Sequence, residues 1–233
     1  MYTKIAFCAT FQDKKHGPVV EYPTLTSSIM TMGKDLRSEG LGTIAMESTG
    51  MYWVPVWNIL EDIGFDLILV NRYLIKQMPG RKSDVKDAQW IATLLHKGLL
   101  RSSLVPCKEI RELLTYSRKY MKLQQRQTSV LQDMERTMEM CSIRITSFVS
   151  NIFGKSVIRV IQEIVDGETS ADVLVELIHG RIVNAHKKEI IKESLKGFIT
   201  PHHRLMLELS LEEYEMLVRQ SSTCLAKMET LCK

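Results

Sequence analysis

The stretch from Cys107 to Phe153 contains neither glycine nor proline, and its side chains follow a heptad pattern. Steps of four and three residues lead from Leu113 to Phe148, with polar positions in the middle at Gln124 and Gln127. A repeat of this length predicts a long helix whose seam of side chains packs against another helix. This feature constrains the fold most, because strands and tight turns cannot accommodate it.

A second seam begins after Pro201 and passes through Leu207, Val218, Leu225 and Cys232. It predicts another long helix, and the chain stops at Lys233 inside the repeat without a helix terminator. Shorter helices are expected between the two seams, where glycines interrupt the sequence. Residues 104–233 are therefore predicted to form a long-helix, coiled-coil-like α domain, and helices 107–150 and 201–233 are the expected surfaces for a homodimer or a higher oligomer.

Residues 1–103 have a different pattern, in which short apolar runs alternate with helical periodicity. Glycines at positions 40, 64 and 98 end the helical segments. An alternation of this kind is typical of an open sheet covered by helices. The predicted strands are 4–11, 18–22, 43–46 and 66–70, and the predicted helices are 26–38, 51–63, 72–78 and 84–97.

The composition is that of an ordinary soluble protein, with a net charge of only +4. Contacts with nucleic acid would therefore depend on local clusters of cations. The five cysteines show no C-x-x-C spacing, which argues against a disulfide framework and against a structural zinc site. No apolar run approaches the roughly 18 residues that a membrane helix needs. The sequence predicts a cytoplasmic protein.

Two acidic residues stand at the start of the predicted helix 84–97. Asp84 and Asp87 are three residues apart, so both project from one face of the helix. They can form a capping arrangement at the positive end of the helix dipole. The alternative is that they bind a metal ion. The basic loop before them, with Arg81 and Lys82, favours this interpretation, since it suits a phosphate backbone. Lys86, inside the same turn, is a further candidate for nucleic-acid contact.

A third carboxylate, Glu47, follows the predicted strand 43–46 and precedes Ser48, Thr49 and Gly50. One interpretation is a strand-end glutamate turned to solvent. The other places Glu47 at the carboxyl end of a sheet strand, where open α/β sheets collect their functional sites. Carboxylates from separate segments can converge on a divalent metal ion, as metal-assisted phosphodiester chemistry requires.

Two long blocks carry a resemblance to a known family: AMESTGMYWVPVWNILEDIGFDLILVN and IKQMPGRKSDVKDAQWIATLLHKGLLRSSLVP. In this order and spacing they closely resemble the DEDD-type transposases of insertion sequences, the Piv/MooV-like group. The match is densest over residues 41–106 and continues more weakly through the helical region. The resemblance implies a RuvC-like, ribonuclease-H-type mixed sheet in residues 1–103, followed by the helical region 104–233.

The resemblance also implies roles for individual residues. Glu47, Asp84 and Asp87 match the second, third and fourth acidic positions of the DEDD set. They would bind Mg²⁺ or Mn²⁺ and assist cleavage and transfer of DNA strands. Arg81 and Lys82 match the basic loop of the family. The implied partners are the DNA of the element ends and of the target, and a guide RNA of the element.

The chain departs from the family pattern at both ends. By this resemblance the strand with the first aspartate would lie before Met1, and we expect the C-terminal domain with its nucleophilic serine to be absent. In a ribonuclease-H-type sheet the missing strand is central, so its loss would expose two unpaired edges. We therefore expect a partial transposase that is inactive or weakly active. The alternatives are a non-catalytic fragment that dimerises or binds nucleic acid, and an unrelated helical protein.

Overall fold

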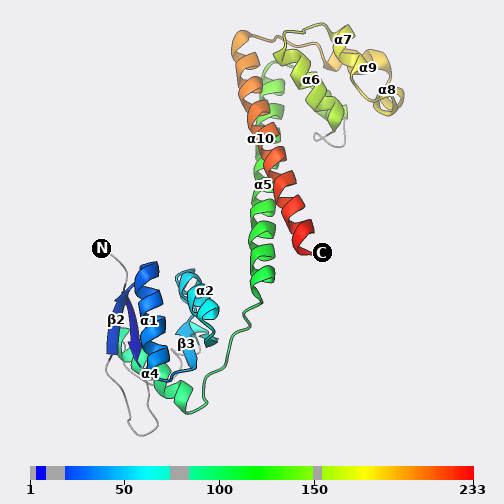
Figure 1. The fold of residues 1–233 in the computed structure, drawn as a ribbon. Coiled ribbons are helices and arrows are strands. Elements are labelled where there is room, and N and C mark those ends of the chain that lie inside the picture. The colour runs from blue at the N-terminus through cyan, green and yellow to red at the C-terminus, as the bar shows by residue number, and fades with distance from the viewer. Residues whose placement is uncertain (1–3, 9–18, 74–83, 149–153) are drawn as a thin grey trace. The chain divides into compact units, whose positions relative to one another are not determined.

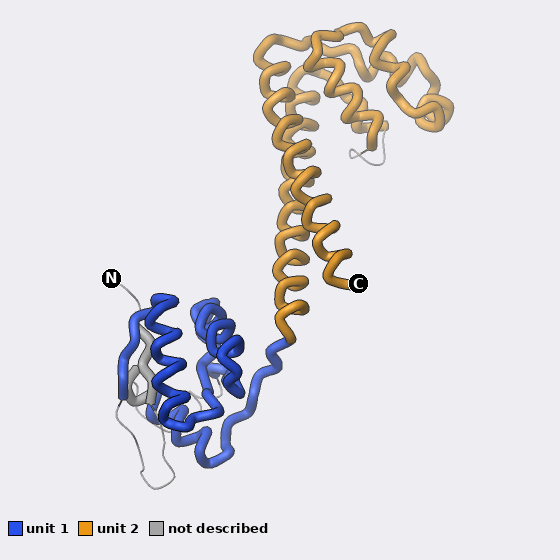
Figure 2. Tube along the Cα trace, in the orientation of Figure 1, with its two compact units in different colours: residues 1–106 blue, residues 107–233 orange. Residues whose placement is uncertain are grey.

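The computed structural model describes residues 4–8, 19–73, 84–148 and 154–233, with the side chains of residues 4–8 and 84–87 left out of the description. The chain divides into two compact units, residues 1–106 and 107–233 (Figure 2). Each unit has its own buried apolar core. Among the described helices, none is long and apolar enough to cross a membrane.

The first unit contains two ladders of two strands each. Strand β1 (Lys4–Cys8) pairs with β2 (Val19–Pro23) in an antiparallel register, and β3 (Thr43–Glu47) pairs with β4 (Asp66–Val70) in a parallel register. The described strands form no hydrogen-bonded ladder between β1–β2 and β3–β4. The mixed α/β character predicted for this region is confirmed. The complete ribonuclease-H-type sheet stays a prediction.

Within the described residues, three helices accompany these strands (Figure 1): α1 (Thr26–Ser38), α2 (Trp53–Ile63) and α4 (Asp84–His96). The predicted helix 72–78 lies outside the described residues from position 74 on. Helix α1 packs on α2 and β2, and α4 contacts β1, β2 and β3. The core between them is apolar, because the helices turn one hydrophobic face inward. Its buried side chains are Ile29, Met32, Leu36, Ile44, Val56, Leu60 and Phe65.

The second unit is helical, as predicted. Helices α5 (Lys108–Met140) and α10 (Pro201–Leu231) run antiparallel, side by side (Figure 1). Between them in sequence lie η1 (Ile145–Phe148), α6 (Lys155–Val165), α7 (Ala171–Glu176), α8 (Gly180–His186) and α9 (Lys188–Ser194). Helix α6 packs on α10 and α9 packs on α7 and α8. The two long helices thus form a hairpin within one chain.

The predicted helix 107–150 is too long, because α5 ends at Met140. Ser142 has a positive φ of 66°, which turns the backbone out of the helix. The Ile143 amide donates to the Met138 carbonyl at 2.9 Å, and the Arg144 amide donates to the Ser194 carbonyl at 2.8 Å. Tertiary contacts therefore end α5 without a glycine or a proline. Residues 149 and 150 of the predicted helix lie outside the described part of the chain.

The seam of α5 is confirmed, whereas the predicted seam after Pro201 is wrong at three positions, Val218, Leu225 and Cys232, which are exposed. Gln127, Leu131, Met134 and Met138 are buried as predicted in α5. In α10 the buried residues are Leu217 and Cys224 instead of their neighbours Val218 and Leu225, which are 37% and 43% exposed. The buried positions there drift from a strict seven-residue repeat, as an α-helix with 3.6 residues per turn does.

Gly197 lies against the turn that ends α5, which leads to a first prediction. A Cβ atom at this position would lie 2.5 Å from the Cys141 carbonyl oxygen and 2.5 Å from Cγ1 of Ile143. We expect Gly197→Ala to lower the free energy of unfolding by about 1–3 kcal/mol, the usual penalty for overpacking. Urea denaturation followed by far-UV circular dichroism measures it.

The matched control for this prediction is Gly180→Ala, because a Cβ there meets no atom within 4 Å. Alanine also has a higher helix propensity than glycine at a helical position. The control should unfold at or above the urea concentration of the wild type. Equal midpoints for the two variants would contradict the close contact at Gly197.

Candidate functional site

The carboxyl ends of β3 and β4 hold the best-defined of the predicted site residues. In the parallel register Glu47 lies opposite Val70, and the Ser48 amide donates to the Val70 carbonyl at 2.9 Å. The far edge of β4 is covered, since the Ser103 amide donates to the Leu69 carbonyl at 2.7 Å. Glu47 therefore projects from the end of β3 beside β4, which is itself held on both sides, and open α/β sheets place functional groups at such strand ends.

The carboxylate of Glu47 is held by two groups. The Arg72 guanidinium approaches Glu47 Oε1, with Nε 3.2 Å away, and the Thr49 hydroxyl donates a hydrogen bond to the same oxygen. The side chain of Glu47 is 22% exposed and that of Arg72 is 53% exposed. The interpretation of Glu47 as a glutamate turned to solvent is therefore wrong. Its side chain is half-buried, and a cation and a hydroxyl orient it.

Arg72 and Thr49 were not among the residues that the sequence singled out. The pairing of β3 with β4 could have pointed to Arg72. Val70 pairs with Glu47, and Arg72 follows Val70 by two residues at the same strand end. A guanidinium beside a carboxylate can form directed, charge-assisted hydrogen bonds. The pair holds the Glu47 carboxylate in a defined position.

The other predicted site residues lie in or before α4. Helix α4 begins at Asp84, as the sequence predicts, so Asp84, Lys86 and Asp87 all belong to its first turn. Their side chains fall outside the description, and Arg81 and Lys82 lie outside the described residues altogether. Since α4 contacts β3, the helix with both aspartates packs on the strand that ends in Glu47.

The described side chains alone contain no group of three histidine, cysteine, aspartate or glutamate residues that could hold a metal ion. Glu47 is the one predicted ligand whose side chain is described, and its neighbours there are a cation and a hydroxyl. Convergence of Glu47 with Asp84 and Asp87 therefore stays a prediction.

The four cysteines whose side chains are described are free thiols, of which Cys141 and Cys224 are buried.

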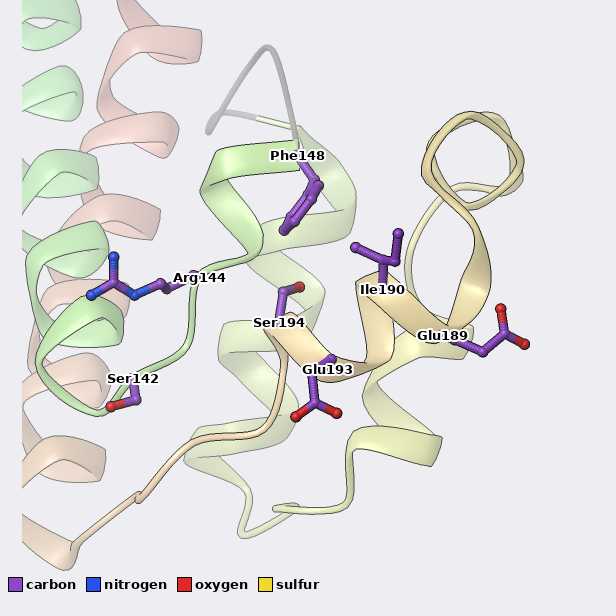
Figure 3. Close-up of a pocket in the computed structure, with 7 residues that line it drawn as sticks. All are labelled: Ser142, Arg144, Phe148, Glu189, Ile190, Glu193 and Ser194. Carbon is purple, nitrogen blue, oxygen red and sulfur yellow. The ribbon is translucent and has the colours of Figure 1, made fainter.

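A separate hollow of about 530 Å³ lies in the second unit (Figure 3). Arg144 borders it from the turn after α5, Phe148 comes from η1, and Ile190 and Glu193 come from α9. Figure 3 shows Phe148, Ile190 and Ser194 grouped together, with Glu189 pointing outward. The hollow is lined by two acidic residues, Glu189 and Glu193, and by one basic residue, Arg144. The net charge of this lining does not favour binding of a phosphate.

Comparison with known families places the sequence among transposases. A transposase family model matches residues 6–142, which is more than half of the chain. No curated protein matches the chain.

The chain belongs to the IS110-type DEDD transposases. The resemblance noted in the sequence is thereby confirmed, and the matched segment includes Glu47, Asp84 and Asp87.

Proposed function

We propose that the protein acts in the DNA transposition of an insertion sequence, by metal-assisted cleavage and transfer of DNA strands. The observation that carries the proposal is the family match over residues 6–142. The position of Glu47 at the carboxyl end of β3, with α4 packed on that strand, supports it. The expectation that this chain is inactive or weakly active stays a prediction from the sequence.

Glu47, Asp84 and Asp87 are the residues that would hold Mg²⁺ or Mn²⁺. Carboxylate oxygens are the ligands that these ions prefer, so the donor set fits the group. When bound, the ion supplies Lewis-acid stabilisation of the charge that develops on the phosphate. Glu47 would bind the ion through a carboxylate that Arg72 and Thr49 orient. Arg81, Lys82 and Lys86 would contact the DNA phosphates near it.

The remaining partners follow from the family resemblance. A guide RNA that directs target choice is part of this proposal, as is a homodimer through helices 107–150 and 201–233. The predicted seams of these helices are largely buried against each other within one chain. A dimer would therefore use their outer faces, where Leu205, Leu209 and Met216 of α10 are 42–50% exposed.

Binding of Mn²⁺, measured by isothermal titration calorimetry, tests the metal site without requiring activity. We expect the wild type to bind Mn²⁺ and the double variant Asp84→Asn, Asp87→Asn to bind it at least about tenfold more weakly, because two anionic ligands are lost. The matched control is Asp133→Asn, Asp172→Asn, which removes two exposed aspartates from the second unit.

The control variant should bind Mn²⁺ like the wild type. Equal affinities for both double variants would show nonspecific binding and contradict the site. Absence of binding by a wild type whose circular dichroism spectrum is folded would contradict the metal-assisted mechanism.

A further inference from the structure

The helical hairpin of the second unit has a strongly uneven distribution of charge. Helix α5 contains no acidic residue from 113 to 132, and α10 contains none from 216 to 228. These two segments lie side by side, because Nε2 of Gln127 donates to the Leu217 carbonyl at 3.1 Å and the helices are antiparallel (Figure 1). We call them together the basic half of the hairpin. Its cations are Arg118, Lys119, Lys122, Arg126, Arg219 and Lys227.

Four of these cations form a row on the outer face of α5. Arg118, Lys122 and Arg126 follow at steps of four residues, so they share one face over about 12 Å of helix axis. Lys119 flanks them. All four side chains are exposed and lie outside the buried seam that contains Gln127. We call Arg118, Lys119, Lys122 and Arg126 the basic row.

Within the described part of the chain, no ion pair links the basic row to an acidic side chain. Two ion pairs of the hairpin lie elsewhere: Arg136 pairs with Asp133 at 3.2 Å, and Arg219 pairs with Glu215 at 3.8 Å. Like charges four residues apart on a helix repel each other and lower its stability. A polyanion that follows the row would remove this repulsion.

We propose that the basic row binds the phosphate backbone of duplex DNA. A row of cations suits sequence-independent contact with phosphates, because it neutralises their charge without reading base edges. A single strand is the poorer fit, because it is normally held by exposed aromatic rings. The nearby rings of Tyr116 and Tyr120 are half-buried, and Tyr120 packs on the core. The choice of DNA as the polyanion rests on the proposed function.

The opposite half of the hairpin limits where DNA can bind. Glu208, Glu212, Glu213 and Glu215 follow one another along α10 with no lysine or arginine between them. Their charge repels phosphates, so the contact is confined to the basic half. The alternative to DNA is a second copy of the chain whose acidic half binds this basic half. The experiment must distinguish the two.

The test is the affinity for a 30-base-pair duplex of arbitrary sequence, measured by fluorescence anisotropy in EDTA. The variant Arg118→Gln, Lys119→Gln, Lys122→Gln, Arg126→Gln removes the basic row. We expect at least about tenfold weaker binding at 100 mM salt. The slope of log K against log salt should become shallower by about 3 to 4, since each phosphate contact contributes roughly 0.9.

The matched control removes four exposed cations from α6, α8 and the residue after α8: Lys155→Gln, Arg159→Gln, Arg181→Gln, Lys187→Gln. It has the same net charge as the first variant. We expect its affinity within about threefold of the wild type and its salt slope reduced by less than about 1. Circular dichroism of both variants verifies that the hairpin is folded.

Four results would overturn the proposal: equal losses in both variants, no duplex binding by the wild type, tighter binding of single-stranded RNA than of the duplex, or a dimer that only the first variant dissociates while DNA binding is unchanged. Because the assay contains no divalent metal, failure of the metal site leaves its result unaffected. One result would support this inference and contradict the catalytic proposal: the wild type binds duplex DNA but not Mn²⁺, and removal of the basic row abolishes the DNA binding.

Discussion

Replacing Met134 by alanine is expected to destabilise the second unit by about 3 kcal/mol. Met134 is 0% exposed on the seam of α5, in the core that also contains Met138, Ile161 and Leu207. Truncation of a fully buried methionine removes its burial free energy and leaves a cavity, which together cost about 2–5 kcal/mol. The effect belongs to the second unit, because Met134 lies wholly within its core.

Far-UV circular dichroism during thermal unfolding measures this change. For a domain of this size, about 3 kcal/mol corresponds to a decrease in the melting temperature of roughly 10–20 °C. The control is Met121→Ala on the same helix, since Met121 is 57% exposed and loses little burial. A melting temperature of Met134→Ala within a few degrees of that control would show that the two long helices do not pack as described.

Replacing Leu60 by alanine is expected to have an effect of similar size on the first unit. Leu60 is 0% exposed and is central to the core between α1, α2 and the strands. Two-stranded ladders contribute little stability alone, so this unit depends on that core. We expect a loss of about 3 kcal/mol, which is enough to unfold much of a marginal unit at 37 °C.

Tryptophan fluorescence separates this second effect from the first. All three tryptophans of the chain, Trp53, Trp57 and Trp90, belong to the first unit. Leu60→Ala should lower the urea midpoint of the fluorescence transition, and Met134→Ala should leave that midpoint unchanged. Leu104→Ala, at a residue that is 92% exposed, serves as the control. A shared midpoint for both probes in every variant would contradict two separate cores.

Several parts of the fold could be read from the sequence. The strand Asp66–Val70 and the helix start at Asp84 agree with the prediction, and the neighbouring boundaries differ by one or two residues. Apolar periodicity and helix-ending glycines determine these elements locally. Membership of the transposase family was also readable, because two blocks of sequence match it in order.

The tertiary structure decided what depends on contacts distant in sequence. The end of α5 at Met140 follows from the turn that Ser194 and Gly197 enclose, and no residue within α5 signals it. The choice of Leu217 over Val218 depends on the direction from which α5 approaches α10. The ion pair of Glu47 with Arg72 depends on the parallel pairing of β3 with β4, because this pairing brings Arg72 to the strand end of Glu47.

The sequence by itself therefore determined the local elements and the family, and it predicts the acidic residues of the metal site. Local periodicity and motif spacing are properties of neighbouring residues, so one chain is enough to reveal them. Only the tertiary structure decided that the two heptad seams pack on each other and that a row of cations is left on the outer face of α5. Which face a helix buries depends on the surface that packs against it, and that surface comes from a segment some ninety residues away, as the Gln127–Leu217 contact shows.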